Sequence, residues 1–144
     1  MTLTFEVNYT QTKKKYKKLF KQINKSIDIH FVSYDDAKDL FNIKSPLEIF
    51  EILNNNKNLV LIRYENNIIF RDKYEEIKTI KVPHGDVVDT TAAGDSFNGA
   101  FLALFNNNKN IQIEDNILKS HSITREVIKH KGAIISKEFM PKLN

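Results

Sequence analysis

The chain has 144 residues, with 22 lysines and arginines against 18 acidic residues, and 41% of it is hydrophobic, as in an ordinary globular protein. It has no cysteine, which excludes a disulfide scaffold, an iron–sulfur cluster, a cysteine-ligated zinc ion and a cysteine nucleophile. No apolar run is long enough to span a bilayer and no signal-peptide pattern opens the sequence, so we expect a cytoplasmic protein without membrane contact.

Periodicity predicts strands that alternate with helices, which indicates an α/β sandwich. The expected strands are residues 3–7, 27–32, 59–62, 68–70, 77–82 and 133–135. The expected helices are residues 12–25, 34–40, 46–53, 95–105 and 113–130. Ser33 is the predicted N-cap of the second helix, Asn66-Asn67 a tight turn between strands, and Gly132 the C-cap of the last helix.

The first predicted helix carries most of the positive charge. Seven lysines lie between positions 13 and 25, and no acid interrupts them. Tyr16, Leu19, Phe20 and Ile23 recur at helical spacing, so the lysines are best interpreted as the solvated face of an amphipathic helix. A nucleic-acid-binding surface is the alternative, and we consider it weaker because no exposed aromatics suited to base stacking are interleaved with the lysines.

The stretch DTTAAGDSFN, residues 89–98, is the candidate site. Two alanines and a glycine precede an amphipathic helix, so a ligand can approach the backbone closely. A helix N-terminus offers unpaired N–H groups and the positive end of the dipole, which together suit a phosphate. Asp95 in the first turn could accept a proton from an alcohol beside that phosphate. The same residues would equally serve as a tight turn and a helix cap.

DTTAAGDSFNGAFLA resembles the C-terminal signature of the ribokinase-like, or PfkB, carbohydrate kinases. EVIKHKGAIISKEFMP and FEVNYTQT are similar to segments of the 2-dehydro-3-deoxygluconate kinases within that family. The resemblance implies a ribokinase-like three-layer α/β/α sandwich, of which residues 1–144 form the C-terminal, nucleotide-binding half of one kinase domain. It also implies ATP with Mg²⁺ as the phosphoryl donor.

The family implies roles for the residues of the candidate site. Asp95 matches the catalytic base that deprotonates the substrate hydroxyl. Ala92, Ala93 and Gly94 match the anion hole, whose backbone amides stabilise the transferring phosphoryl group. No pair of histidines in the chain has metal-ligand spacing on one helix face, so we expect no metal site built from protein side chains alone.

Other matches are carried by single positions. Asp89 and Thr91 match positions that bind a monovalent cation, K⁺, in some members. Asn8 matches the asparagine that faces the nucleotide phosphates. Ser33 and Asp36 fall on a pattern that is linked to magnesium and phosphate, with serine in place of the usual asparagine and aspartate in place of the usual glutamate.

The chain departs from the family at several positions. Thr10 replaces an arginine, and a hydroxyl cannot replace a bidentate guanidinium. Tyr64 and Asn67 stand where the nucleotide loop has glycines. Thr124-Arg125 stands where small residues line the nucleotide pocket, and Ser136 replaces a proline.

Three functions follow from these patterns. The first is the base-bearing half of an ATP-dependent kinase that converts 2-dehydro-3-deoxygluconate to its 6-phosphate. The second is an inactive remnant that at most binds nucleotide, and the third is the basic nucleic-acid-binding module. Since the family's N-terminal, sugar-binding half is not part of the resemblance, we expect an open sheet edge near Leu3, Phe5 and Val7. A separate N-terminal kinase half or a second copy of this chain would pair there.

Overall fold

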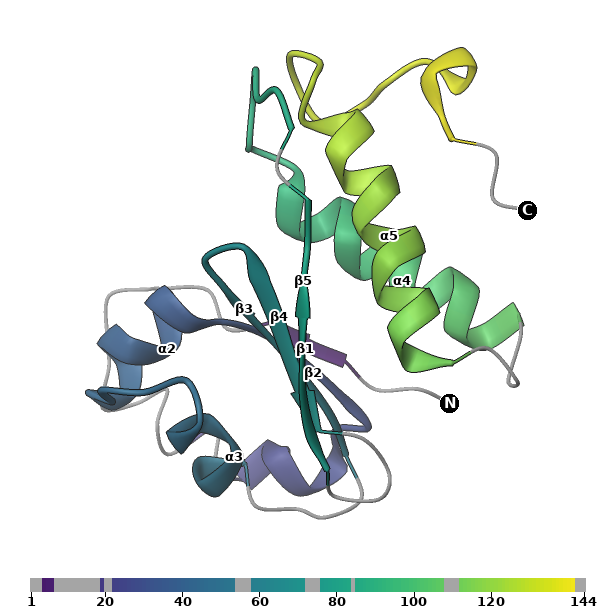
Figure 1. Cartoon of the computed structure of the whole chain (residues 1–144). Coiled ribbons are helices and arrows are strands. Elements are labelled where there is room, and N and C mark those ends of the chain that lie inside the picture. The colour runs from purple at the N-terminus through teal and green to yellow at the C-terminus, as the bar shows by residue number, and fades with distance from the viewer. Residues whose placement is uncertain are drawn as a thin grey trace. The chain divides into compact units, whose positions relative to one another are not determined.

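The computed structural model describes residues 4–6, 19, 22–53, 58–71, 76–83, 85–107 and 112–141. The chain divides into two compact units, Met1–Lys81 and Val82–Asn144, which are described in turn (Figure 1). Most of the predicted lysine-rich helix, together with Asn8 and Thr10, lies outside the described residues. None of the helices in the described ranges is long and apolar enough to cross a membrane.

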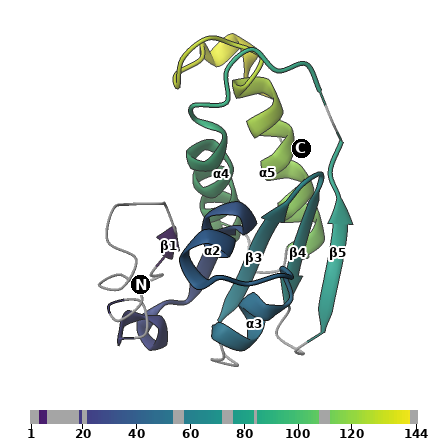
Figure 2. The ribbon, with the colours of Figure 1, turned by 90° about the vertical axis from the view of Figure 1, so that its left-hand side faces the viewer.

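The first unit is built on a mixed sheet of five strands in the order β1-β2-β3-β4-β5 (Figure 2). These are β1 (Thr4–Glu6), β2 (Ile29–Ser33), β3 (Leu59–Tyr64), β4 (Asn67–Arg71) and β5 (Ile77–Lys81). The first three strands are parallel, while β4 and β5 are each antiparallel to the strand before them. β1 is therefore an edge strand of the described sheet, as the sequence predicts.

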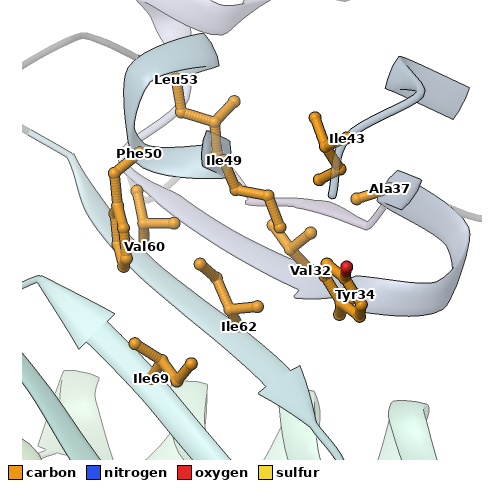
Figure 3. Packing of buried hydrophobic residues seen from close by; sticks show 10 residues of the cluster. All are labelled: Val32, Tyr34, Ala37, Ile43, Ile49, Phe50, Leu53, Val60, Ile62 and Ile69. Carbon is orange, nitrogen blue, oxygen red and sulfur yellow. The ribbon is translucent and has the colours of Figure 1, made fainter. Parts of the chain in front are cut away.

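Two helices, α2 (Tyr34–Phe41) and α3 (Glu48–Ile52), lie on one face of this sheet. Alternate residues of the central strands point to that face, so Val32, Ile62 and Ile69 form one row across three strands. They pack with Ile49, Phe50 and Leu53 from the α3 region into one buried cluster (Figure 3). Burial of side chains of this size stabilises the fold by about 1.5–3 kcal/mol each.

The ends of these helices have identifiable causes. Ser33 Oγ accepts a hydrogen bond from Asp36 N at 3.5 Å, which confirms the predicted N-cap of α2. The predicted helix start at residue 46 is two residues too early, because α3 begins at Glu48. Glu48 Oε1 accepts the N–H groups of Lys44 and Ser45, each at 2.8 Å, so these amides are bound by a side chain rather than by a helical turn.

The β3–β4 hairpin turns one residue earlier than predicted. Tyr64 pairs with Asn67, so the turn is Glu65-Asn66 rather than Asn66-Asn67. Glu65 has φ 51°, in the left-handed region. The strands on both sides are longer than the sequence predicts, and their pairing sets the position of the turn.

The second unit contains α4 (Ala93–Asn107), α5 (Ile113–Val127) and a short 3₁₀ helix, η2 (Lys137–Phe139). The helices α4 and α5 pack side by side, as both views show. Their contact includes a buried polar interaction, in which Asn116 Nδ2 donates to the carbonyl of Phe101 at 3.2 Å. Ser120 Oγ donates to the backbone carbonyl of Asn116 at 2.6 Å, so the buried polar groups of Asn116 and Ser120 have hydrogen-bond partners within the unit.

Two predictions for the end of the chain are wrong. The last helix ends at Val127, not at residue 130. Residues 133–135, which lie within the described ranges, form no strand. Gly132 has φ +90° and donates its N–H to Asp89 Oδ2 at 3.0 Å, so the chain turns here instead of entering a sheet. Ile135 then packs against the buried residues Ala92, Ile123 and Val127.

Candidate active site

The turn before α4 is ordered by its own backbone. Thr90 O accepts the N–H of Ala93 at 3.0 Å, and Ala92 O accepts the N–H of Ser96 at 2.9 Å. Ser96 Oγ adds a bond to the Ala93 carbonyl at 3.1 Å. α4 therefore starts at Ala93, two residues before the predicted start at 95. Ala92 is buried, and Asp95 is exposed in the first helical turn.

This geometry decides which amides remain open, that is, without a backbone acceptor. The N–H of Ala93 is already bound to Thr90 O. In the described part of the chain, the N–H groups of Ala92, Gly94 and Asp95 donate to no backbone carbonyl. They lie at the start of a fifteen-residue helix, where the dipole favours an anion. The predicted set of Ala92, Ala93 and Gly94 stays a prediction, and the geometry adds the amide of Asp95 as a donor.

The carboxylate of Asp95 is open to the surroundings. It is exposed, and no hydrogen bond or ion pair engages it among the described residues. Because it follows Gly94 directly, it lies within one helical turn of the open N–H groups. A proton acceptor next to anion-binding amides is the arrangement that phosphoryl transfer to a hydroxyl requires.

Asp89 and Thr91, the pair predicted to bind K⁺, lie in direct contact. Asp89 Oδ1 accepts the Thr91 hydroxyl at 2.5 Å and the Thr91 N–H at 2.9 Å. Gly132 N–H donates to the other oxygen at 3.0 Å. The hydrogen bonds from the Thr91 side chain, the Thr91 amide and the Gly132 amide, in that order, lower the pKa of Asp89 to about 2. Asp89 is therefore a carboxylate at neutral pH.

The loop that leads to this turn runs along α5 (Figure 1). His121 Nε2 donates to the carbonyl of Pro83 at 3.0 Å. Further along, Ile128 O accepts the N–H groups of Val88 and Asp89 at 2.8 and 3.1 Å. These contacts, at both ends of the segment from Pro83 to Asp89, hold it against the C-terminal half of α5.

Arg125 lies between those two contacts. A Cβ atom on Gly85 would stand 2.9 Å from Arg125 Nε, so a larger residue here would require the arginine side chain to shift. Arg125 Nε is buried without a hydrogen-bond partner. The arginine that replaces the family's small residues thus packs against backbone.

The remaining predicted residues belong to the first unit. Ser33 Oγ caps α2 by accepting the N–H of Asp36. This contact does not test the predicted role of the two residues near magnesium and phosphate. The ring of Tyr64 packs edge-on against Tyr34 with 4.8 Å between centroids. Asn8 and Thr10 lie outside the described residues.

The side chains of the described residues limit how a metal ion could bind. No group of three histidine, aspartate or glutamate residues with the geometry of a metal site occurs in the ranges that the structure describes. Mg²⁺ is commonly held by substrate phosphates with one or two carboxylates, so it does not need such a group. At Asp89, three protein donors already use most of the acceptor positions of the carboxylate.

Sequence reasoning did not find Gly132 and Ile128 as partners of the Asp89 loop. A glycine at position 132 indicates a left-handed φ, but the sequence pattern predicts only that this glycine caps the last helix. Its N–H reaches a carboxylate 43 positions earlier in the chain. Ile128 contributes only its carbonyl oxygen, which no side-chain pattern reveals.

Comparisons with known proteins identify the family of the chain. The sequence pattern of the pfkB family carbohydrate kinases matches residues 2–140. The 2-dehydro-3-deoxygluconokinase of Haemophilus influenzae is 36% identical over 120 residues, which cover 81% of this chain and 38% of that protein. The enzyme of the same name from Escherichia coli K12 is 30% identical over 147 residues, which cover 95% of this chain and 47% of that protein. The chain thus spans less than half the length of these relatives.

A solved structure gives the same fold. A double mutant of the fructokinase from Vibrio cholerae O395, with fructose, ADP and a potassium ion bound, aligns with a TM-score of 0.78 at 15% identity. The alignment covers 92% of this chain and 46% of that one. The chain therefore has the ribokinase-like α/β fold and belongs to the pfkB family of carbohydrate kinases.

Proposed function

We propose that this chain carries the nucleotide-facing, base-bearing part of a kinase that transfers the γ-phosphoryl group of ATP to a sugar-acid hydroxyl. The observation that carries the proposal is the exposed Asp95 carboxylate one turn from the open N–H groups of Ala92, Gly94 and Asp95. The preferred substrate is 2-dehydro-3-deoxygluconate, because two of the relatives bear the name of the kinase for that sugar acid. The product is then its 6-phosphate.

The reaction assigns a task to each group. The open amides and the N-terminus of α4 bind the oxygens of the γ-phosphoryl group and stabilise the charge that develops there. Asp95 accepts the proton of the substrate hydroxyl. The hydroxyl oxygen then bonds to the γ-phosphorus while the bond to ADP breaks, and ADP leaves. Mg²⁺, which arrives with ATP, neutralises phosphate charge.

Further ligand contacts rest on the family resemblance. Asn8 would face the nucleotide phosphates, and Ser33 with Asp36 would lie near Mg²⁺ and phosphate. Arg125 stands where the family has small residues, and its side chain is packed on Gly85. We therefore expect the nucleotide base to meet a more polar surface than in relatives with small residues there.

The proposed activity needs the sugar-binding part of the kinase fold. The relatives are more than twice the length of the stretch that this chain matches, so more than half of their length has no counterpart in it. β1 lies at the edge of the described sheet, where a further strand can add. We propose that an N-terminal kinase half joins the chain at this edge. A second copy of the chain is the alternative partner.

A nucleotide-binding remnant without turnover is the second candidate. Two observations favour it: Tyr64, in place of a loop glycine, packs on Tyr34, and the Arg125 side chain packs on the backbone of Gly85. By the family resemblance these two positions belong to the nucleotide loop and the nucleotide pocket, so larger side chains there would hinder the approach of ATP.

Reconstitution separates the two candidates. The chain would be mixed with the N-terminal half of the Haemophilus influenzae relative, ATP, Mg²⁺ and 2-dehydro-3-deoxygluconate, and the sugar phosphate followed by ³¹P NMR. We expect turnover that Asp95→Asn lowers by about 10²–10⁴-fold, as for loss of a general base. Asp86→Asn, an exposed carboxylate in the preceding loop, is the matched control and should keep full activity. Turnover that survives Asp95→Asn contradicts the assigned base, and nucleotide binding without turnover selects the remnant.

A further inference from the structure

We propose that Asp89 is a positioning residue, whose carboxylate clamps the turn before α4 to the turn after α5, and that it does not act as the ligand of a monovalent cation. The purpose of the clamp rests on the proposed function, because the turn it holds is the one that would bind phosphate. Its existence rests only on contacts within the second unit.

One side of the clamp organises the approach to α4. Asp89 Oδ1 accepts both the hydroxyl and the N–H of Thr91, at 2.5 and 2.9 Å. Thr90 lies between Asp89 and Thr91 in the chain, and its carbonyl accepts the N–H of Ala93 at 3.0 Å. The carboxylate thereby fixes the backbone from Asp89 to Thr91. The bond between Thr90 and Ala93 joins this turn to the first residue of α4, next to the N–H groups of Gly94 and Asp95.

The other side of the clamp reaches the end of α5. Asp89 Oδ2 accepts the N–H of Gly132 at 3.0 Å. The backbone joins the same two segments independently, because Ile128 O accepts the N–H groups of Val88 and Asp89 at 2.8 and 3.1 Å. Gly132 has φ +90°, a conformation that glycine adopts without strain. The loop before α4 and the turn after α5 are thus tied at adjacent points.

The same contacts argue against a cation at this carboxylate. An ionised carboxylate has about four acceptor positions, and three of them are taken by protein donors. The Thr91 hydroxyl directs its proton at Asp89. One acceptor position on Oδ2 remains, so a cation there would have to share the carboxylate with three hydrogen bonds that are strong because their acceptor is charged. The residues present therefore fit a clamp better than K⁺.

Amide hydrogen exchange of the ¹⁵N-labelled full chain tests the clamp. Asp89→Asn keeps an acceptor for Thr91 but turns a donor toward Gly132, so we expect the Gly132 amide to exchange about tenfold faster or more. Thr91→Val should loosen the turn more mildly, and Thr91→Ser, which retains the hydroxyl, should restore wild-type exchange. Asp86→Asn is the matched control, and its exchange should equal that of the wild type. Unchanged Gly132 exchange in a folded Asp89→Asn variant overturns the clamp.

Replacing K⁺ in the buffer tests whether Asp89 instead binds a monovalent cation. Replacing KCl with choline chloride at equal ionic strength should leave the Thr91 and Gly132 amide resonances of the wild type in place. A K⁺-dependent shift of these resonances that Asp89→Asn abolishes would overturn the proposal.

Nucleotide affinity tests the purpose of the clamp. In an ATP·Mg²⁺ titration, Asp89→Asn should weaken binding about tenfold, whereas Thr91→Ser should bind as the wild type does. Equal affinity in Asp89→Asn and wild type overturns the positioning role. If the wild type itself binds no ATP·Mg²⁺, the proposed function fails, while the exchange and cation measurements still decide whether the clamp exists.

Discussion

His30 is an ionisable side chain in the middle of β2 with no exposed surface. Asn58 Nδ2 lies 3.2 Å from His30 Nε2 and, as an amide nitrogen, must donate to it. This contact requires the neutral imidazole. Burial, and secondarily the positive charge of Arg71, lower the pKa of His30 from 6.5 to about 4. Arg71 and His30 flank Val60 in one row of the sheet.

The lowered pKa predicts that acid destabilises the first unit. Because the unfolded chain binds a proton near pH 6.5 and the folded chain only near pH 4, stability is complete above pH 6.5 and falls between these values. The full loss is about 3 kcal/mol. All five tyrosines lie in the first unit, so tyrosine fluorescence in urea titrations at pH 7.5 and 4.5 measures it.

Two variants serve as controls for this prediction. His30→Leu should abolish the loss of stability between the two pH values, whereas His130→Gln, in the second unit, should preserve it. A His30→Leu protein with the wild-type pH dependence would show that another group titrates.

Residue-level features were predictable where they depend on neighbours in sequence. Ser33 as an N-cap needs only the local pattern, and the structure confirms it. The family resemblance singled out Asp89 and Thr91 as positions of a cation site, but it did not predict the hydrogen bonds between them. The bond from Gly132 to Asp89 could not be predicted, since it depends on how two distant turns meet.

At the scale of elements, Gly99 and Gly132 have opposite roles. Gly99 lies inside α4, and an added Cβ would meet nothing within 4 Å. Gly132 also has open space, but its φ is +90°. The first glycine only weakens a helix, whereas the second allows a backbone conformation that other residues rarely adopt.

Alanine substitutions should therefore shift stability in opposite directions. Gly99→Ala should raise the free energy of unfolding by up to about 1 kcal/mol, because alanine is the better helix former. Gly132→Ala should lower it by about 1–2 kcal/mol, the cost of a left-handed conformation. Thermal unfolding followed by circular dichroism measures both. Shifts of the same sign would mean that packing, not backbone conformation, decides these positions.

Element type was predictable from periodicity, but boundaries depended on contacts. The alternation of strands and helices gave the α/β class. Residues 133–135 are apolar and suggest a strand, yet no partner strand exists for them among the described residues, and Ile134 is 90% exposed. The hairpin turn shifted by one residue because strand pairing extends through Tyr64 and Asn67.

At the scale of the whole molecule, the proposed function depends on the turn before α4. Family membership is established by the match over residues 2–140, while the chain spans less than half of its longer relatives. A working kinase would thus combine this site with a sugar-binding part. The proposed γ-phosphate contact at the turn before α4 uses residues 92–95 of the second unit, so it can be tested on this chain alone.

The most direct measurement is an ATP·Mg²⁺ titration of the ¹⁵N-labelled chain followed by amide resonances. We expect the largest shifts at Ala92, Gly94 and Asp95, whose N–H groups have no backbone acceptor, and far smaller shifts with AMP, which lacks the γ-phosphate. Absence of any shift at these amides at millimolar ATP·Mg²⁺, or equal shifts with AMP, would contradict the proposed phosphate site.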